Sequence, residues 1–95
     1  MKIARSSYPE YASVTGLAVA IDVLRAFTTA SFLFEAGVDE ILLVSTVEEA
    51  FRLHEEMPDC LLLGEIDGVK VQGFDLGNSP SEIRQHNLRG KRILQ

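Results

Sequence analysis

Short runs of consecutive apolar residues constrain the fold of this chain more than any other feature of its sequence. The runs do not alternate between apolar and polar residues, which indicates strands buried on both faces of a sheet. They lie within residues 17–21, 40–45, 60–63 and 92–95. Segments with helical spacing separate them, at residues 27–36, 47–57 and 80–86. This alternation predicts an α/β fold with three α/β/α layers around a largely parallel or mixed sheet, and residues 2–5 are expected to add an edge strand.

The first predicted helix is apolar on all sides. One of its faces, defined by spacings of three, four and seven residues, carries Phe27, Ala30, Ser31 and Phe34. Phe32 and Leu33 lie on other faces, so we expect this helix to be covered on both sides. A central position in the fold, a second subunit or further chain would each provide such a cover, and we expect a homo-oligomer.

Composition limits the class of protein. A length of 95 residues with 46% hydrophobic residues suits one small α/β domain spanning residues 1–95. The net charge of −5 argues against binding to nucleic acid, and no apolar run approaches the roughly 20 residues that span a bilayer. A single cysteine and the lack of a signal-peptide pattern favour the cytoplasm. The chain stops inside a predicted strand, so we expect it to be the N-terminal portion of a longer protein.

A glycine-rich loop at residues 73–80 combines polar side chains with a helix start. Gly73 and Gly77 allow a ligand to approach the backbone, and Ser79-Pro80-Ser81-Glu82 has the pattern of a capped helix N-terminus. The glutamate is expected to reach back to the amide of the capping serine. Unpaired N–H groups at such a start suit a phosphate, so the loop is a candidate anion site. A tight turn before a well-capped helix explains the same residues, and both interpretations stay open.

Polar residues follow the predicted strands at their carboxyl ends, where open α/β sheets bind ligands. Asp22 and Arg25 follow the first strand, and Glu65 follows the third. The glycine-rich loop is expected to bring Asp75, Asn78 and Ser79 to the same edge. Carboxylate and amide oxygens suit Mg²⁺, while an arginine suits a phosphate. These residues predict a metal-assisted phosphoryl site, although a phosphate-binding module that lacks catalysis fits them equally well.

Three sequence blocks resemble the 2-phosphosulfolactate phosphatase family. They are Ile-Asp-Val-Leu-Arg-Ala-Phe-Thr-Thr-Ala at residues 21–30, Thr-Val-Glu-Glu-Ala at residues 46–50, and Gly64-Glu65 with Gly68 and the loop at residues 73–80. The blocks occur in the family's order over residues 17–95. The resemblance implies an α/β/α fold and a Mg²⁺-dependent phosphatase that hydrolyses a small anionic phosphoester. In the named family member this substrate is 2-phospho-3-sulfolactate, on the route to coenzyme M, and the chemistry transfers to relatives more securely than the substrate.

The resemblance places six residues on motif positions, and we assign their roles from their chemistry: Asp22, Arg25, Glu65, Asp75, Asn78 and Ser79. Asp22, Glu65 and Asp75 are candidates for holding Mg²⁺, and with Arg25 they form the expected catalytic set. The expected phosphate-binding groups are Arg25, Thr28, Thr29, Gly77, Asn78 and Ser79. For Thr28 and Thr29, capping of the helix start is an equally good explanation. We expect a metal-bound water to attack the phosphorus atom, with a carboxylate nucleophile as the alternative.

The chain departs from the family in length. Family members run to more than twice these 95 residues and carry a Thr-Asn-Gly-Thr block that this chain lacks. Two hypotheses therefore stay open. The chain is the N-terminal portion of a phosphatase, which is inactive alone if the site needs both halves. Alternatively, it is a non-catalytic domain that binds a small anion or forms oligomers.

Overall fold

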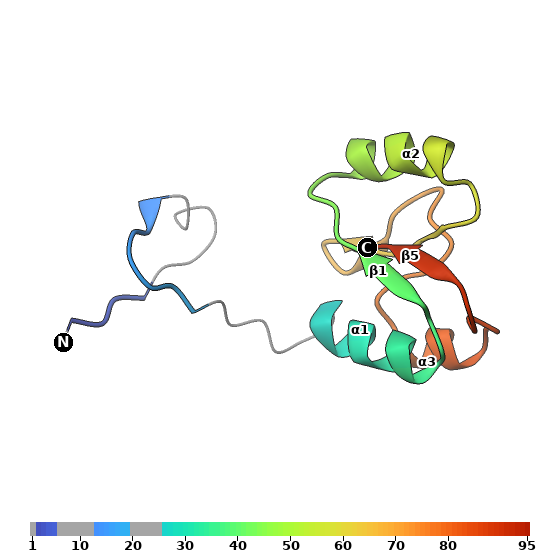
Figure 1. Cartoon of the computed structure of the whole chain (residues 1–95), viewed down its shortest axis with the longest axis horizontal. Coiled ribbons are helices and arrows are strands. Elements are labelled where there is room, and N and C mark those ends of the chain that lie inside the picture. Colours follow the sequence, from blue (N-terminus) through green and yellow to red (C-terminus); the bar gives the residue numbers. More distant parts are fainter. Residues whose placement is uncertain (1, 6–12, 20–25) are drawn as a thin grey trace.

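The computed structural model describes residues 2–5, 13–19 and 26–95. Residues 26–95 form three layers in which a sheet separates α2 from α1 and α3 (Figure 1). In chain order the elements are α1 (Ala26–Glu35), β1 (Glu40–Leu42), α2 (Val47–Glu56), β2 (Leu61–Leu62), β3 (Glu65–Ile66), β4 (Val69–Lys70), α3 (Pro80–Arg84) and β5 (Arg92–Leu94). This arrangement confirms the predicted α/β class.

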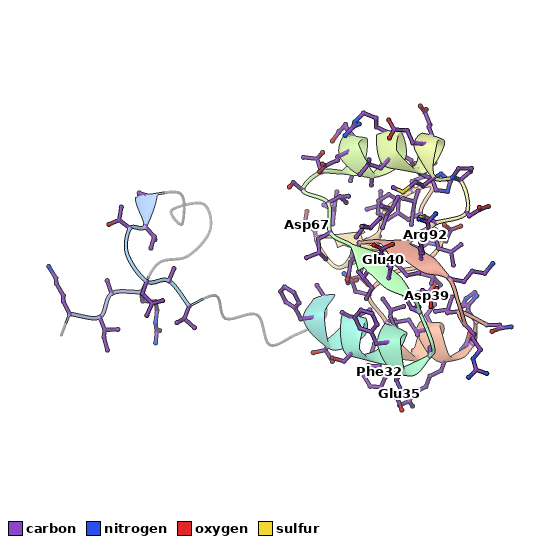
Figure 2. All side chains as sticks on the ribbon, in the orientation of Figure 1. Phe32, Glu35, Asp39, Glu40, Asp67 and Arg92 are labelled. Atoms are coloured by element: carbon purple, nitrogen blue, oxygen red, sulfur yellow. The ribbon has the colours of Figure 1, made fainter. Side chains whose placement is uncertain are left out.

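The main sheet is parallel, and its strand order is β1-β5-β2. The last strand in the sequence therefore lies between the two earlier ones. Glu40 of β1 is paired in register with Arg92 of β5 (Figure 2), and Leu62 of β2 with Leu94. Because the strands are parallel, all three carboxyl ends meet at one edge of the sheet.

Successive residues of the strands pack on opposite sides of the sheet. Leu63 and Ile93 belong to the apolar cluster beneath α1 and α3, whereas Leu62 and Leu94 belong to the cluster beneath α2. Each of these four side chains is 2% exposed or less. Burial on both faces explains why the sequence shows continuous apolar runs rather than alternation. Cys60 is 1% exposed in the α2 cluster, as expected for a small core residue.

Helix α1 confirms the predicted position, and the described part of the chain buries one side of it. Its fully buried residues are Thr29 and Leu33, whereas Phe27 and Phe34 are each 55% exposed. Apolar residues occur on every side of this helix, and the expected cover over both sides stays a prediction. Phe32 contacts α3, where the Arg84 guanidinium carbon lies 5.2 Å from its ring centroid.

Two predicted N-terminal strands are absent from the described residues. Residues 2–5 and 17–19 form no strand, and Leu17 and Val19 are 97% and 79% exposed. Both expectations were wrong for these residues, because an apolar run indicates a tendency to be buried but does not supply the neighbouring strand. Residues 20 and 21 of the second predicted strand lie outside the described residues. In the described part of the chain, no helix has the length and apolar character needed to cross a bilayer.

Candidate functional site

A hollow of about 300 Å³ lies where the carboxyl ends of the strands meet the start of α1. Its walls come from five segments that are distant in the sequence. They are Ala26 and Phe27 of α1, Leu43 and Val44 after β1, Gly64 and Glu65 after β2, Asn78 of the glycine-rich loop, and Gln95 after β5. This is the edge at which the sequence predicts a ligand site.

The glycine-rich loop reaches this edge by running beside β2. Leu76 forms a parallel bridge with Leu63, and the Gly64 amide donates to the Leu76 carbonyl oxygen at 3.0 Å. The amides of Asp75 and Leu76 both donate to the carbonyl oxygen of Leu62. These bonds cover the outer edge of β2 and carry the next residues, Gly77 and Asn78, to the carboxyl end of the sheet.

Asn78 is held by three hydrogen bonds from three different elements. Its amide donates to Oε1 of Glu65 at 2.9 Å, and its carbonyl oxygen accepts a bond from Oγ1 of Thr29 at 3.3 Å. Its side-chain Oδ1 accepts a bond from Nε2 of Gln95 at 3.4 Å. Thr29 is fully buried, so its hydroxyl has a structural bond rather than an open face. Asn78 therefore joins α1, the hairpin formed by β3 and β4, and the end of the central strand β5.

The loop amides that could bind an anion are engaged by carboxylates. The Gly77 amide donates to Oε2 of Glu82 at 3.2 Å, and the Asn78 amide donates to Glu65. A Cβ on residue 77 would lie 3.1 Å from Oε1 of Glu65 and 3.4 Å from Oε2 of Glu82, so the absent side chain permits both carboxylates to approach. In this structure two protein carboxylates occupy the positions in which a phosphate oxygen was expected.

The start of α3 differs in detail from the predicted capping pattern. Ser79 occupies the N-cap position and Pro80 the first turn, as expected, but the Ser79 side chain caps no amide. Its Oγ lies 2.9 Å from Oγ of Ser81. Glu82 bonds Gly77, two residues before the expected partner. The helix ends at Arg84, so it is shorter than the predicted segment and too short for an extended dipole.

Asp75 lies apart from the hollow. Its Oδ2 accepts a hydrogen bond from the amide of Leu62 at 2.8 Å, and it does not belong to the residues that line the hollow. The geometry gives this carboxylate a backbone partner in β2. Its predicted role as a metal ligand stays a prediction.

The other predicted site residues fall into two groups. Glu65, Asn78, Gly77 and Thr29 are brought together at the carboxyl edge, while Thr28 lies on an exposed part of α1. Asp22 and Arg25 lie outside the described residues. Within residues 2–5, 13–19 and 26–95, no three acidic, histidine or cysteine side chains are close enough to hold a metal ion together. The described residues thus supply one carboxylate and two amide side chains to the hollow, which is part of a Mg²⁺ ligand set.

Two residues at the site were missed by the sequence reasoning. Gln95 follows β5 at the carboxyl edge, and the rule that selected Asp22 and Glu65 would also have selected it. Lys70 is paired in register with Glu65 across the β3–β4 hairpin. The hairpin turn at Asp67 and Gly68, with φ of 52° and 78°, was the available signal for this pairing.

A larger hollow of about 490 Å³ lies at the opposite edge, where β2 and β5 begin. It is lined by Pro58, Asp59, Leu61, Gly90, Lys91 and Arg92. We place the site in the smaller hollow, because parallel sheets bind their ligands at the carboxyl ends of the strands.

Comparison with known proteins identifies clear relatives. Residues 3–95 match the family described as 2-phosphosulpholactate phosphatase. A protein of Bacillus subtilis named "Probable 2-phosphosulfolactate phosphatase" is 48% identical over 77 residues, which cover 81% of this chain and 34% of the relative. A protein of Deinococcus radiodurans with the same name is 47% identical over 89 residues, which cover 94% of this chain and 35% of the relative. The chain spans about a third of the length of these relatives.

Proposed function

Because the chain belongs to the 2-phosphosulfolactate phosphatase family, we propose that it provides the N-terminal part of a phosphatase site for a small anionic phosphoester. The observation that carries the proposal is the convergence of Glu65, Asn78 and Gln95 on one hollow at the carboxyl edge of the sheet. The substrate that we propose is 2-phospho-3-sulfolactate, with sulfolactate and phosphate as products, because the relatives carry the name probable 2-phosphosulfolactate phosphatase. We propose a cytoplasmic homo-oligomer as the active form.

The dimensions of the hollow support a small substrate. A volume of about 300 Å³ is at the lower end of the usual range for ligand sites, so it favours a compact phosphoester over a nucleotide. The polar side chains that line the hollow are Glu65, Asn78 and Gln95. Phe27 and Leu43 also line it, and their side chains are 55% and 67% exposed. We propose that the phosphoryl group binds beside the polar side chains.

We propose that Glu65 holds Mg²⁺ together with Asp22. Mg²⁺ is usually bound through one or two carboxylates, with water and substrate oxygens completing the shell, so the one carboxylate that the described residues place at the hollow fits this ion. When bound, the ion polarises the phosphoryl oxygens and orients the attacking water. The backbone N–H of Asn78 donates a hydrogen bond to Oε1 of Glu65 at 2.9 Å, which fixes the direction of the carboxylate. Asp75 is a further candidate ligand and would first have to leave the Leu62 amide.

Arg25 and the Asn78 side chain are the proposed phosphate-binding groups. The amides of Gly77 and Asn78 are engaged by Glu82 and Glu65, so they bind a phosphate only if those carboxylates move. In this proposal, side-chain donors therefore contribute more to anion binding than the backbone amides do. Thr28 and Ser79 are additional hydroxyl donors. Asp22, Arg25, Glu65 and Asp75 remain the proposed catalytic set.

The test is phosphate release from 2-phospho-3-sulfolactate, measured for this chain and for the full-length Bacillus subtilis relative. We expect the relative to release phosphate with Mg²⁺ and to lose this activity when the metal is chelated. The matched variants are Asp22→Asn, which should abolish most of the activity in any form of this protein that turns over, and Asp59→Asn at the opposite edge, which should not.

Three results would count against the proposal. Turnover that survives complete removal of metal would exclude the role of Mg²⁺, and full activity of Asp22→Asn would exclude that carboxylate. Saturable phosphate binding by this chain and by the relative without turnover under any metal would favour the non-catalytic anion-binding domain instead.

A further inference from the structure

Gln95 occupies the point at which three parts of the site meet. Its backbone joins β5 to β1, because the Gln95 amide donates to the Leu42 carbonyl and the Val44 amide donates to the Gln95 carbonyl, both at 2.9 Å. Its side-chain Nε2 donates to the Ala26 carbonyl at 3.0 Å and to Oδ1 of Asn78 at 3.4 Å. The residue thus connects the central strand, the first residue of α1 and the glycine-rich loop.

The direction of these bonds is fixed by the backbone. A carbonyl oxygen can only accept a hydrogen bond, so the Ala26 carbonyl selects the nitrogen end of the Gln95 amide. The second hydrogen of the same nitrogen then selects the oxygen end of the Asn78 amide. In the reversed orientation two donor groups would face each other. The Ala26 carbonyl oxygen therefore sets the orientation of the Gln95 side-chain amide, which in turn sets that of the Asn78 side-chain amide.

The nitrogen end of the Asn78 amide is left as a donor. Asn78 is half-buried and lines the hollow, and within residues 2–5, 13–19 and 26–95 no group accepts a hydrogen bond from its Nδ2. We propose that Gln95 is a positioning residue that holds the Asn78 amide in this orientation, so that Nδ2 donates to an anionic oxygen of the substrate. The proposal deepens the phosphatase function above and rests on it for the anionic character of the ligand.

The double-mutant cycle of Gln95 and Asn78 tests the proposal with inorganic phosphate as the probe. Gln95→Met keeps the length of the side chain and removes the donor, while Asn78→Ala removes the amide and keeps the backbone bonds to Glu65 and Thr29. Gln85→Met, at an exposed position in α3's C-cap, is the matched control. Phosphate is titrated into the ¹⁵N-labelled chain, and the side-chain amide signals of Asn78 are followed together with the backbone signals.

We expect phosphate to shift the Asn78 side-chain signals in the wild-type chain. Gln95→Met should weaken phosphate binding about tenfold, the effect of losing one oriented hydrogen bond to a charged group. In the Asn78→Ala background the same substitution should have no further effect, because Gln95 acts through Asn78. Gln85→Met should bind phosphate as the wild type does.

The proposal fails if Gln95→Met weakens binding equally in both backgrounds, which would indicate a general effect on the fold. It also fails if Gln95→Met binds phosphate normally, or if phosphate leaves the Asn78 side-chain signals unchanged. The phosphatase function is judged separately by turnover. If Gln95 and Asn78 are coupled in phosphate binding but no turnover is found, the phosphatase proposal fails and the positioning role of Gln95 stands. If turnover is found but the two residues are not coupled, only the proposed role of Gln95 fails.

Discussion

Two substitutions of Asp75 can distinguish a structural role of its carboxylate from a role in metal binding. Its Oδ2 lies 2.8 Å from the amide nitrogen of Leu62, a residue that is only 2% exposed. Asp75→Ala leaves that amide without its acceptor. Asp75→Asn keeps an oxygen in the same place and removes only the charge.

The magnitude follows from the type of bond. A hydrogen bond to a charged group contributes about 1.5–3 kcal/mol, and partial access of water to this site favours the lower part of that range. We therefore expect Asp75→Ala to lower the free energy of unfolding by about 2 kcal/mol. For a domain of this size each kcal/mol lowers the melting temperature by about 4–8 °C. Asp75→Asn should cost less than about 1 kcal/mol, because a neutral acceptor remains.

Urea denaturation of both variants gives the free energies, with Asp59→Ala as the control at an exposed carboxylate. The control should stay within about 0.5 kcal/mol of the wild type. If Asp75→Ala has the same free energy of unfolding as the wild type, the hydrogen bond between the Leu62 amide and Asp75 does not stabilise the fold. With stability preserved, the phosphatase activity of Asp75→Asn then reports on chemistry alone: a loss would support the proposed metal role, and retention would exclude it.

Three further substitutions test the packing around the site by the same denaturation experiment. Thr46→Ala removes the N-cap oxygen that accepts from the Glu49 amide at 3.1 Å, so it should cost about 1 kcal/mol, while Thr46→Ser should restore most of it. Leu63→Ala creates a cavity at a fully buried position and should cost about 2–5 kcal/mol, and a loss below 1 kcal/mol would contradict the assigned core. Gly73→Ala should cost about 1–2 kcal/mol, because the residue has φ of 89° and its Cβ would lie 3.1 Å from Cζ of Phe51; an unchanged midpoint would show that this loop rearranges freely.

The fold class followed from local patterns, whereas the strand order did not. The runs that became β1, β2 and β5 are apolar because both of their faces are buried, and this property is visible in the sequence. The insertion of β5 between β1 and β2 depends on pairing between residues 32 and 52 positions apart, and three apolar strands of similar length offer no local signal for it.

Helix α1 shows the same limit on a smaller scale. Thr29 is buried together with Leu33, whereas Phe27 and Phe34 are exposed, and the Thr29 hydroxyl bonds the Asn78 carbonyl 49 residues away. A buried hydroxyl is acceptable only with such a partner, so the buried face of the helix is decided by the loop that packs against it. The helical period alone could not identify that loop.

The sequence placed several candidate residues at one edge of the sheet, but their hydrogen bonds were not predictable. Strand ends and the glycine-rich loop placed Glu65 and Asn78 at one edge, and the structure joins them at 2.9 Å. One of the two interpretations of the glycine-rich loop was a binding site for an external anion, because exposed amides attract any negative group. Glu65 and Glu82 are also negative, and they lie close enough in the fold to occupy the amides first. In the proposed site, a substrate anion would therefore compete with two protein carboxylates for the loop amides. A cation bound by Glu65 would weaken one of these competitors, which gives a physical reason for the proposal that metal and phosphate bind to this edge together.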